Sequence, residues 1–200
     1  MSKLVFDIET IGDDYESLDE ATQENLTRWI KKEAENDGDY KILLEDLKQG
    51  LGFSPLTGEV VAIGVLDPDT QKGAVYFQAP GYNIDDIEKQ MQESSARQDI
   101  KYEIGTEKEI LEKFWQVASF CSEFISFNGR GFDGPFLAIR SAIHRIKPTK
   151  DLMSNRYLNL QKFNARHIDL LEQLTFYGAV RRKGSLHLWC KAFGIKSPKT

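Results

Sequence analysis

The sequence has few cysteines and no long apolar run, and both absences exclude classes of protein. Its two cysteines, Cys121 and Cys190, cannot form a disulfide scaffold and show neither zinc-site spacing nor a C-x-x-C motif. The longest apolar stretch, Val60 to Leu66, is too short to span a membrane as a helix. The segment before Asp7 is too short for a signal peptide. These features favour a cytoplasmic protein that does not interact with membranes.

The composition is that of an ordinary globular protein. With 12 Phe, 7 Tyr and 3 Trp among 200 residues, the chain has enough apolar surface to bury and is not expected to be disordered. Early strands with a hairpin, followed by alternating helices and strands, predict a mixed α/β sheet in one domain over residues 1–200. A helical pattern around residues 13–52 is predicted to be an insert in that domain.

Helix ends are indicated by capping patterns. Ser17 with Glu20, and Thr106 with Glu109, fit the capping box that starts a helix. Ser185 is predicted to cap the last helix.

Charge is distributed unevenly along the chain, whose net charge is −5. Residues 140–200 contain thirteen Lys and Arg against three acids, a net charge of +10, which leaves −15 for the rest. A basic third beside an acidic body suits a polyanionic partner held against a group of carboxylates. A solvated surface without a partner is the alternative interpretation.

Two carboxylates stand close together at the end of the first predicted strand. Side chains at positions i and i+2 of a strand point to the same face, so Asp7 and Glu9 are expected to lie together. Their mutual repulsion would be relieved by a divalent cation bound to their oxygens. Acids at a strand end that simply face water give the same pattern.

A third carboxylate, Asp133, lies at the predicted start of a helix. It follows a predicted strand and the turn Asn128-Gly-Arg-Gly131, and Pro135 stands in the first helical turn. An aspartate at this position is also a normal helix cap. The two roles are compatible, because the positive end of the helix favours an ionised carboxylate in either case.

Together these segments resemble a known family. Phe6-Asp-Ile-Glu-Thr10 is similar to the first motif of the DnaQ-like 3′–5′ exonucleases, the DEDD group of the ribonuclease H-like superfamily. The second segment, in its form Asn-Gly-x-x-Phe-Asp-x-Pro-Phe-Leu, resembles their second motif and is most similar to the predicted DNA-polymerase-B-like exonucleases. The resemblance continues from His167 to Gly194 but does not cover residues 11–53.

The resemblance implies a ribonuclease H-like α/β fold, with a mixed five-stranded sheet in the order 3-2-1-4-5 and helices on both faces. It also implies two Mg²⁺ or Mn²⁺ ions about 4 Å apart. Asp7 would bind both ions, Glu9 the ion on the side of the nucleophile, and Asp133 the other ion. Thr10, Asn128 and Phe132 would hold the surrounding loop and contact the substrate.

One departure from the family pattern concerns its third motif. That motif supplies a fourth carboxylate as Tyr-x-x-x-Asp or His-x-x-x-x-Asp, and no such spacing follows Asp133. Asp169 fits better as the residue that ends one strand and opens a helix. We therefore expect the 200 residues to be a truncated form of such an enzyme, with little or no activity.

Function is predicted as metal-dependent 3′–5′ hydrolysis of single-stranded DNA, with DNA preferred to RNA. The basic run Arg181-Arg182-Lys183 is a candidate phosphate contact, although such runs are often only solvated loops. The missing fourth carboxylate leaves open a catalytically silent nucleic-acid-binding module. A phosphatase with an Asp-x-Asp nucleophile is a weaker alternative, because position 9 is Glu and the pattern leaves Asp133 unexplained.

Overall fold

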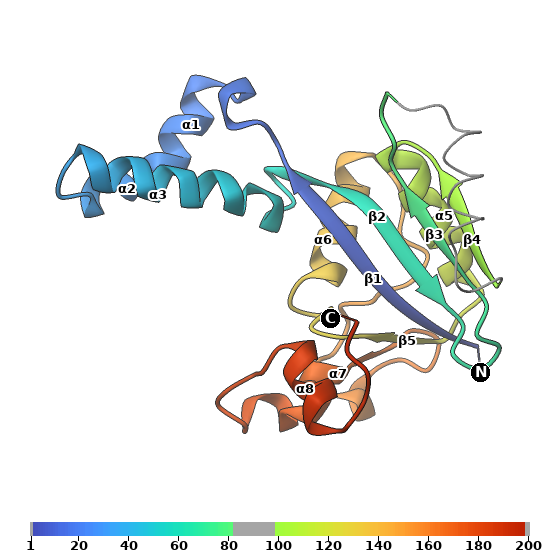
Figure 1. Ribbon diagram of the computed structural model, residues 1–200. Helices are drawn as coiled ribbons and strands as arrows, with labels where there is room; N and C mark the ends of the chain where they lie inside the picture. Colours follow the sequence, from blue (N-terminus) through green and yellow to red (C-terminus); the bar gives the residue numbers. More distant parts are fainter. Residues whose placement is uncertain (1, 82–98, 199–200) are drawn as a thin grey trace.

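A mixed six-stranded sheet organises the chain (Figure 1), for which the computed structural model describes residues 2–81 and 99–198. Its order is β4-β3-β2-β1-β5-β6. The β1–β2 and β2–β3 pairs are antiparallel, whereas β3–β4, β1–β5 and β5–β6 are parallel. The strands are β1 (Lys3–Gly12), β2 (Gly58–Leu66), β3 (Gly73–Phe77), β4 (Ile100–Ile104), β5 (Glu123–Ser126) and β6 (Arg166–Asp169).

Five of these strands follow the predicted order, and the sixth is a correction. β3, β2, β1, β5 and β6 lie in the sequence of neighbours predicted as 3-2-1-4-5. The additional strand, β4, pairs with β3 at the edge of the sheet. Its five residues include Lys101 and Glu103, so its apolar pattern is too short and too interrupted to indicate a strand by itself.

The helices lie in three parts of the molecule: against the sheet, in the insert and in the C-terminal part. Figure 1 shows the insert, residues 13–53, projecting away from the sheet as an arm. Residues 170–198 form a C-terminal lobe next to β5 and β6 (Figure 1). No helix in residues 2–81 or 99–198 is long and apolar enough to cross a membrane. The helices are η1 (Tyr15–Ser17), α1 (Glu20–Thr27), α2 (Ile30–Glu33), α3 (Asp37–Gly50), η2 (Leu51–Phe53), α5 (Glu107–Ser119), α6 (Asp133–Ile143), η3 (Leu158–Leu160), α7 (Leu170–Leu174), η4 (Phe176–Gly178) and α8 (Leu186–Ala192).

The core lies between the sheet and helices α5 and α6. Side chains of β1 alternate, so that Leu4, Phe6 and Ile8 are buried while Asp7 and Glu9 are exposed. Phe6 packs against Phe114 of α5, with the ring centroids 5.6 Å apart. The buried face of β1 thus supports the helices, and its opposite face leaves the two acidic side chains in solvent. The fully buried apolar side chains of the core include Val60, Ile63, Ile110, Leu111, Phe124 and Leu137.

Of the three helix caps predicted at Ser or Thr, two are confirmed. Thr106 and Glu109 form both hydrogen bonds of a capping box, and the Ser185 hydroxyl accepts a hydrogen bond from the Leu188 amide. The prediction for Ser17 with Glu20 is wrong, because Asp19 caps α1 through the Thr22 amide. An aspartate at the adjacent position offers a carboxylate to the same exposed amides, and it takes the cap.

Close backbone packing joins the arm to β1. A Cβ atom at Gly12 would lie 2.7 Å from the Gly52 nitrogen, so the two ends of the arm approach too closely for side chains. The Thr10 hydroxyl donates a hydrogen bond to the Gly52 carbonyl oxygen at 2.7 Å. The base of the arm is therefore attached to the same end of β1 that carries Glu9.

One buried carboxylate links three elements of the fold. Glu107, only 4% exposed at the start of α5, accepts hydrogen bonds from Nε and Nη2 of Arg140 at 2.8 and 2.6 Å and from the Val60 amide at 2.8 Å. His144 Nε2 lies 2.5 Å from Glu107 Oε2. Burial alone would raise the pKa of Glu107, but the hydrogen bonds from Arg140, Val60 and His144 outweigh it and lower the pKa.

Glu107→Gln should lower the free energy of unfolding at neutral pH by about 2–4 kcal/mol, because it leaves the Arg140 guanidinium without its buried partner. The wild-type advantage is present above the unfolded-state pKa, near 4.3, and is lost as the pH falls through the lower folded-state pKa. Urea unfolding of both proteins across this range measures the difference.

The control is Glu112→Gln, which removes an exposed ion pair with Lys108 on the same helix. It should change stability by less than about 0.5 kcal/mol. A stability difference between wild type and Glu107→Gln that persists unchanged into strong acid would contradict this account.

Candidate functional site

A buried hydrogen bond connects β1 to the start of α6. Oδ1 of Asp133 accepts a hydrogen bond from the Ile8 amide at 3.0 Å, across 125 residues of sequence. β1 pairs with β5 only from Lys3 to Val5, so the Ile8 amide lies beyond the paired segment and needs another acceptor. Asp133 supplies it, which fixes the first turn of α6 against the acidic part of β1.

This hydrogen bond brings Asp133 next to Asp7. Burial and, after it, the neighbouring charge of Asp7 raise the pKa of Asp133, while the amide of Ile8 lowers it, and the net result is a pKa of about 7. Asp133 is 3% exposed, whereas Asp7 is exposed. The two predicted site segments therefore lie next to each other, and each contributes a carboxyl group: Asp133 is buried and Asp7 is open to solvent.

Glu9 lies two residues further along the same exposed face of β1. The register of β1 and β2 shifts immediately after it, because Glu9 pairs with Ala62 while Thr10 pairs with Val60. Such irregularities redirect side chains locally. In residues 2–81 and 99–198, no three His, Cys, Asp or Glu side chains gather closely enough to form a metal site by themselves. Glu9 thus lies near Asp7 in the sequence, but it does not form a three-residue metal site with Asp7 and Asp133 in the structure.

The donor set still fits one kind of metal ion. Mg²⁺ is commonly held by one or two carboxylates together with water and substrate phosphate, rather than by a complete cage of protein ligands. Asp7 and Asp133 offer two carboxyl groups, and the raised pKa of Asp133 reflects its burial first and repulsion from the Asp7 charge second. A bound cation would relieve that repulsion.

The turn before α6 is held by Asp169 at the end of β6. Asp169 accepts hydrogen bonds from the amides of Asn128 and Arg130, each at 2.9 Å, and it also caps α7 through Leu171. Asn128 has a positive φ of 63°, a conformation that asparagine tolerates better than most residues. Because its oxygens are occupied by backbone amides, Asp169 acts as a support for the turn. Its role as a helix cap is confirmed, and its second role toward Asn128 and Arg130 was not predicted.

His167 is also structural. Its Nε2 lies 2.8 Å from Ser126 Oγ, its Nδ1 lies 3.0 Å from the Leu152 carbonyl oxygen, and its ring packs against Phe6. Burial lowers the pKa of His167 to about 4. The neutral imidazole of β6 thus connects this strand with Ser126 of β5 and with the core.

The remaining candidate residues lie on β1, on the turn before α6 and on the C-terminal lobe. Phe132 directly precedes Asp133 and contacts the exposed ring of Phe53 at the base of the arm, with centroids 6.3 Å apart. The Thr10 hydroxyl is engaged with Gly52, as described above. Arg181, Arg182 and Lys183 are all exposed on the C-terminal lobe.

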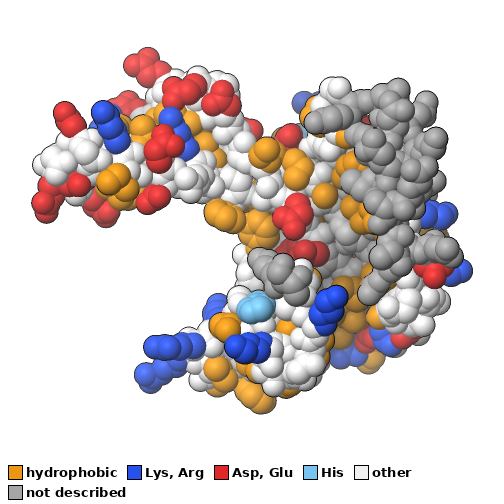
Figure 2. Space-filling model, viewed as in Figure 1, with side chains coloured by type: hydrophobic (Ala, Val, Ile, Leu, Met, Phe, Trp, Pro, Cys, Tyr) orange, Lys and Arg blue, Asp and Glu red, His pale blue; other side chains and the backbone are white. Residues whose placement is uncertain are grey.

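A hollow lies between the arm and the C-terminal lobe. Figure 2 shows acidic side chains at its inner end, over β1, and Lys and Arg side chains gathered on the lobe. The arm is itself acidic, with twelve Asp and Glu against five Lys and Arg in residues 13–53. A polyanion entering this hollow would be attracted by the lobe and repelled by the arm.

Asp133→Asn should change how stability depends on pH in metal-free buffer. The folded-state pKa of about 7 exceeds the unfolded value near 3.9, so the wild type should lose stability as the pH rises between these values, by up to about 4 kcal/mol. The asparagine keeps an acceptor for the Ile8 amide but does not titrate. The stability of the variant should therefore not fall over this pH range.

Urea unfolding in EDTA at a series of pH values measures the effect. Asp69→Asn, at an exposed pair with Lys3, is the matched control and should follow the wild type. If the wild type and Asp133→Asn differ by the same amount at pH 4 and pH 8, the raised pKa is wrong.

Comparisons with known proteins found one matching family and similar solved structures. Residues 83–197 match the profile of a family described as "Predicted 3′-5′ exonuclease related to the exonuclease domain of PolB". None of the curated proteins matches. Among solved structures, the family B DNA polymerase from the hyperthermophilic archaeon Pyrobaculum calidifontis is similar over 98% of this chain, with 13% identity and a TM-score of 0.49. This chain spans 18% of that polymerase.

The matched residues include the turn at Asn128, Asp133 and Asp169, whereas Asp7 and Glu9 lie before them. The match covers more than half of the 200 residues. The chain therefore belongs to the family of predicted 3′–5′ exonucleases related to the exonuclease domain of PolB.

Proposed function

We propose that this chain is a metal-dependent 3′–5′ exonuclease that hydrolyses phosphodiester bonds at the 3′ end of single-stranded DNA. The observation that carries the proposal is the contact between Asp7 and Asp133, which lie 126 positions apart in the sequence and are brought together by the Ile8 hydrogen bond. A pair of carboxyl groups, one buried and one exposed, suits a cation that neutralises substrate phosphate.

Asp7 and Asp133 would hold Mg²⁺ or Mn²⁺, and Glu9 would contribute to a second ion next to Asp7. Bound ions would supply an activated water and stabilise negative charge on the phosphate and on the departing 3′ oxygen. The exposed Asp7 and Glu9 and the buried Asp133 would supply the ligands, and Asp133 would have to lose its proton to take part.

The rest of the chain would orient the substrate. The turn at Asn128 is held rigidly by Asp169, so the main chain next to Asp133 does not have to order itself when substrate arrives. Phe132 packs between Phe53 and Phe136, and this packing would hold the main chain next to Asp133 in place for the substrate. The basic run 181–183 on the C-terminal lobe would contact the phosphates of the strand.

Asp7→Ala and Asp133→Ala should each lower the rate of 3′ degradation of 5′-labelled single-stranded DNA by more than about a hundredfold, because each removes a carboxylate ligand. Degradation should require Mg²⁺ or Mn²⁺ and stop in EDTA. Denaturing gels of the labelled products measure the rate and the direction.

Asp69→Ala is the matched control, since it removes an exposed acid that pairs with Lys3 near the other end of β1. It should leave the rate unchanged. Metal-independent degradation, or normal rates in either site variant, would refute the mechanism. A matched RNA strand tests the preference for DNA.

The second candidate is a nucleic-acid-binding module that has the fold but no activity. It is favoured by one observation: no group of three metal-binding side chains is gathered within residues 2–81 and 99–198. In that case the wild type would bind single strands without degrading them at any Mg²⁺ or Mn²⁺ concentration.

A further inference from the structure

We propose that η4 of the C-terminal lobe presents Phe176 as a stacking platform for an unpaired base of the substrate, with the neighbouring basic residues 181–183 on its phosphates. This inference rests on the proposed function and deepens it, because it names the part of the lobe that binds the strand away from the reacting end.

The backbone of η4 has an uncommon conformation. Phe176, Tyr177 and Gly178 have φ angles of 49°, 55° and 99°, so three consecutive residues lie in the left-handed region. Bulky side chains rarely adopt this conformation, which costs roughly 1–2 kcal/mol per residue. Hydrogen bonds from the amides of Gly178 and Val180 to the Thr175 carbonyl oxygen, at 3.1 and 3.0 Å, close the turn.

Tyr177 faces inward and holds the turn in place. Its ring packs edge-on against Tyr157, with centroids 4.8 Å apart, and its hydroxyl accepts hydrogen bonds from Gln173 Nε2 at 3.0 Å and from the Leu158 amide at 3.4 Å. Nη2 of Arg156 donates to the Tyr177 carbonyl oxygen at 3.2 Å. Both the ring and the main chain of this residue are therefore fixed.

Phe176, by contrast, is 74% exposed. The chain thus maintains an unusual backbone at this position without burying the aromatic ring beside it. Strained conformations of this kind persist where the surrounding structure enforces them, and they are concentrated at binding sites. An exposed ring on a fixed turn can stack on a nucleobase with little loss of conformational entropy.

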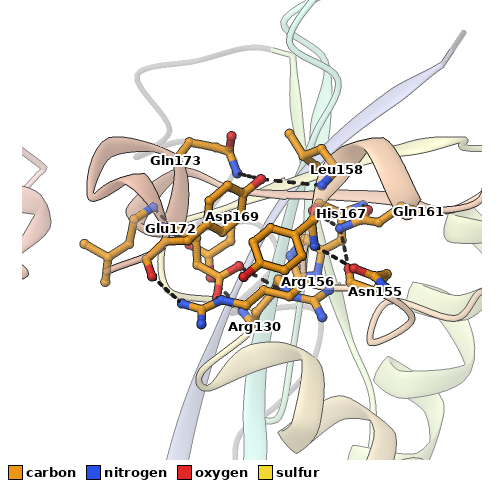
Figure 3. Close-up of polar contacts among 12 residues, drawn as sticks. Arg130, Asn155, Arg156, Leu158, Gln161, His167, Asp169, Glu172 and Gln173 are labelled. Atoms are coloured by element: carbon orange, nitrogen blue, oxygen red, sulfur yellow. Dashed lines mark hydrogen bonds and ion pairs between the residues drawn. The ribbon is translucent and has the colours of Figure 1, made fainter. Parts of the chain in front are cut away.

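The turn is connected to the candidate active site by charged side chains (Figure 3). Nε of Arg156 lies 2.7 Å from Glu172 Oε1, and Glu172 Oε2 lies 3.6 Å from Nε of Arg130. The Arg130 amide in turn donates to Asp169, within the turn that precedes Asp133. A strand stacked on Phe176 would therefore be bound to a part of the molecule that is held firmly relative to the carboxylates.

Charge favours a nucleic acid over a protein as the ligand of this surface. Three exposed basic residues follow within seven positions of Phe176, and residues 140–200 carry a net charge of +10. An exposed aromatic ring beside a basic run is the combination that binds single strands without sequence preference.

The test measures binding without hydrolysis. With the whole chain in EDTA, fluorescence anisotropy of labelled oligodeoxythymidylate should show that Phe176→Ala weakens binding by about 5- to 50-fold. Phe176→Trp should bind at least as well as wild type. The matched control is Phe120→Ala, which removes a ring that is 78% exposed just before β5, at the end of the sheet opposite Asn128. It should bind as wild type does.

A second measurement distinguishes stacking from a general effect on the lobe. An abasic site moved along the oligonucleotide should weaken wild-type binding most at one position, and Phe176→Ala should lose that position dependence. Equal binding of wild type and Phe176→Ala, or an abasic profile that is the same in both, would overturn the inference, and so would binding that is lost equally in Phe176→Trp.

The two proposals fail in distinguishable ways. Phe176-dependent binding in a chain that never degrades DNA would refute the exonuclease and leave the stacking platform in place. Degradation that depends on Asp7 and Asp133, in a chain whose Phe176→Ala variant binds normally, would refute the platform alone.

Discussion

The hydrogen bond from the Ile8 amide to Asp133 determines the candidate site. β1 continues past its pairing with β5, and the unpaired amide is satisfied by the first residue of α6. The same contact places a buried carboxyl group beside Asp7, where burial and like charge raise the pKa of Asp133 to about 7. The folded state thus holds a destabilising pair of acidic groups at the position where a bound cation would neutralise them. Strongly shifted pKa values of this kind are common at functional sites.

The other unusual features of the structure support that contact. Asp169 occupies both its oxygens with amides, which holds the turn before Asp133, and His167 fills the space below it as a neutral ring. The arm is attached to the end of β1 through closely packed glycines, and the C-terminal lobe is connected to the turn through Glu172 and two arginines. The hollow between the arm and the lobe consequently ends at the two carboxyl groups (Figure 2).

Local patterns predicted most of the strands and the capping box at Thr106, because strand alternation and helix caps depend on residues that are neighbours in the sequence. The approach of Asp7 to Asp133 was implied only by the family resemblance. Contacts between distant residues were not predictable in the same way. In the sequence, Glu107 has the pattern of an exposed acid in the first turn of a helix. Only the fold brings Arg140, His144 and the Val60 amide to it. β4 was missed because five alternating residues at a sheet edge give a weak pattern, and the cap of α1 was misplaced because Asp19 competes with Ser17 for the same amides.

The most direct test of this account is Mn²⁺ binding to the whole chain, followed by electron paramagnetic resonance of the free ion at neutral pH. The account predicts that wild type binds Mn²⁺, that Asp7→Asn and Asp133→Asn each weaken binding by at least about tenfold, and that binding releases a proton because Asp133 must ionise. Mn²⁺ affinity that is unchanged in Asp133→Asn would contradict the claim that Asp7 and Asp133 form one cation site.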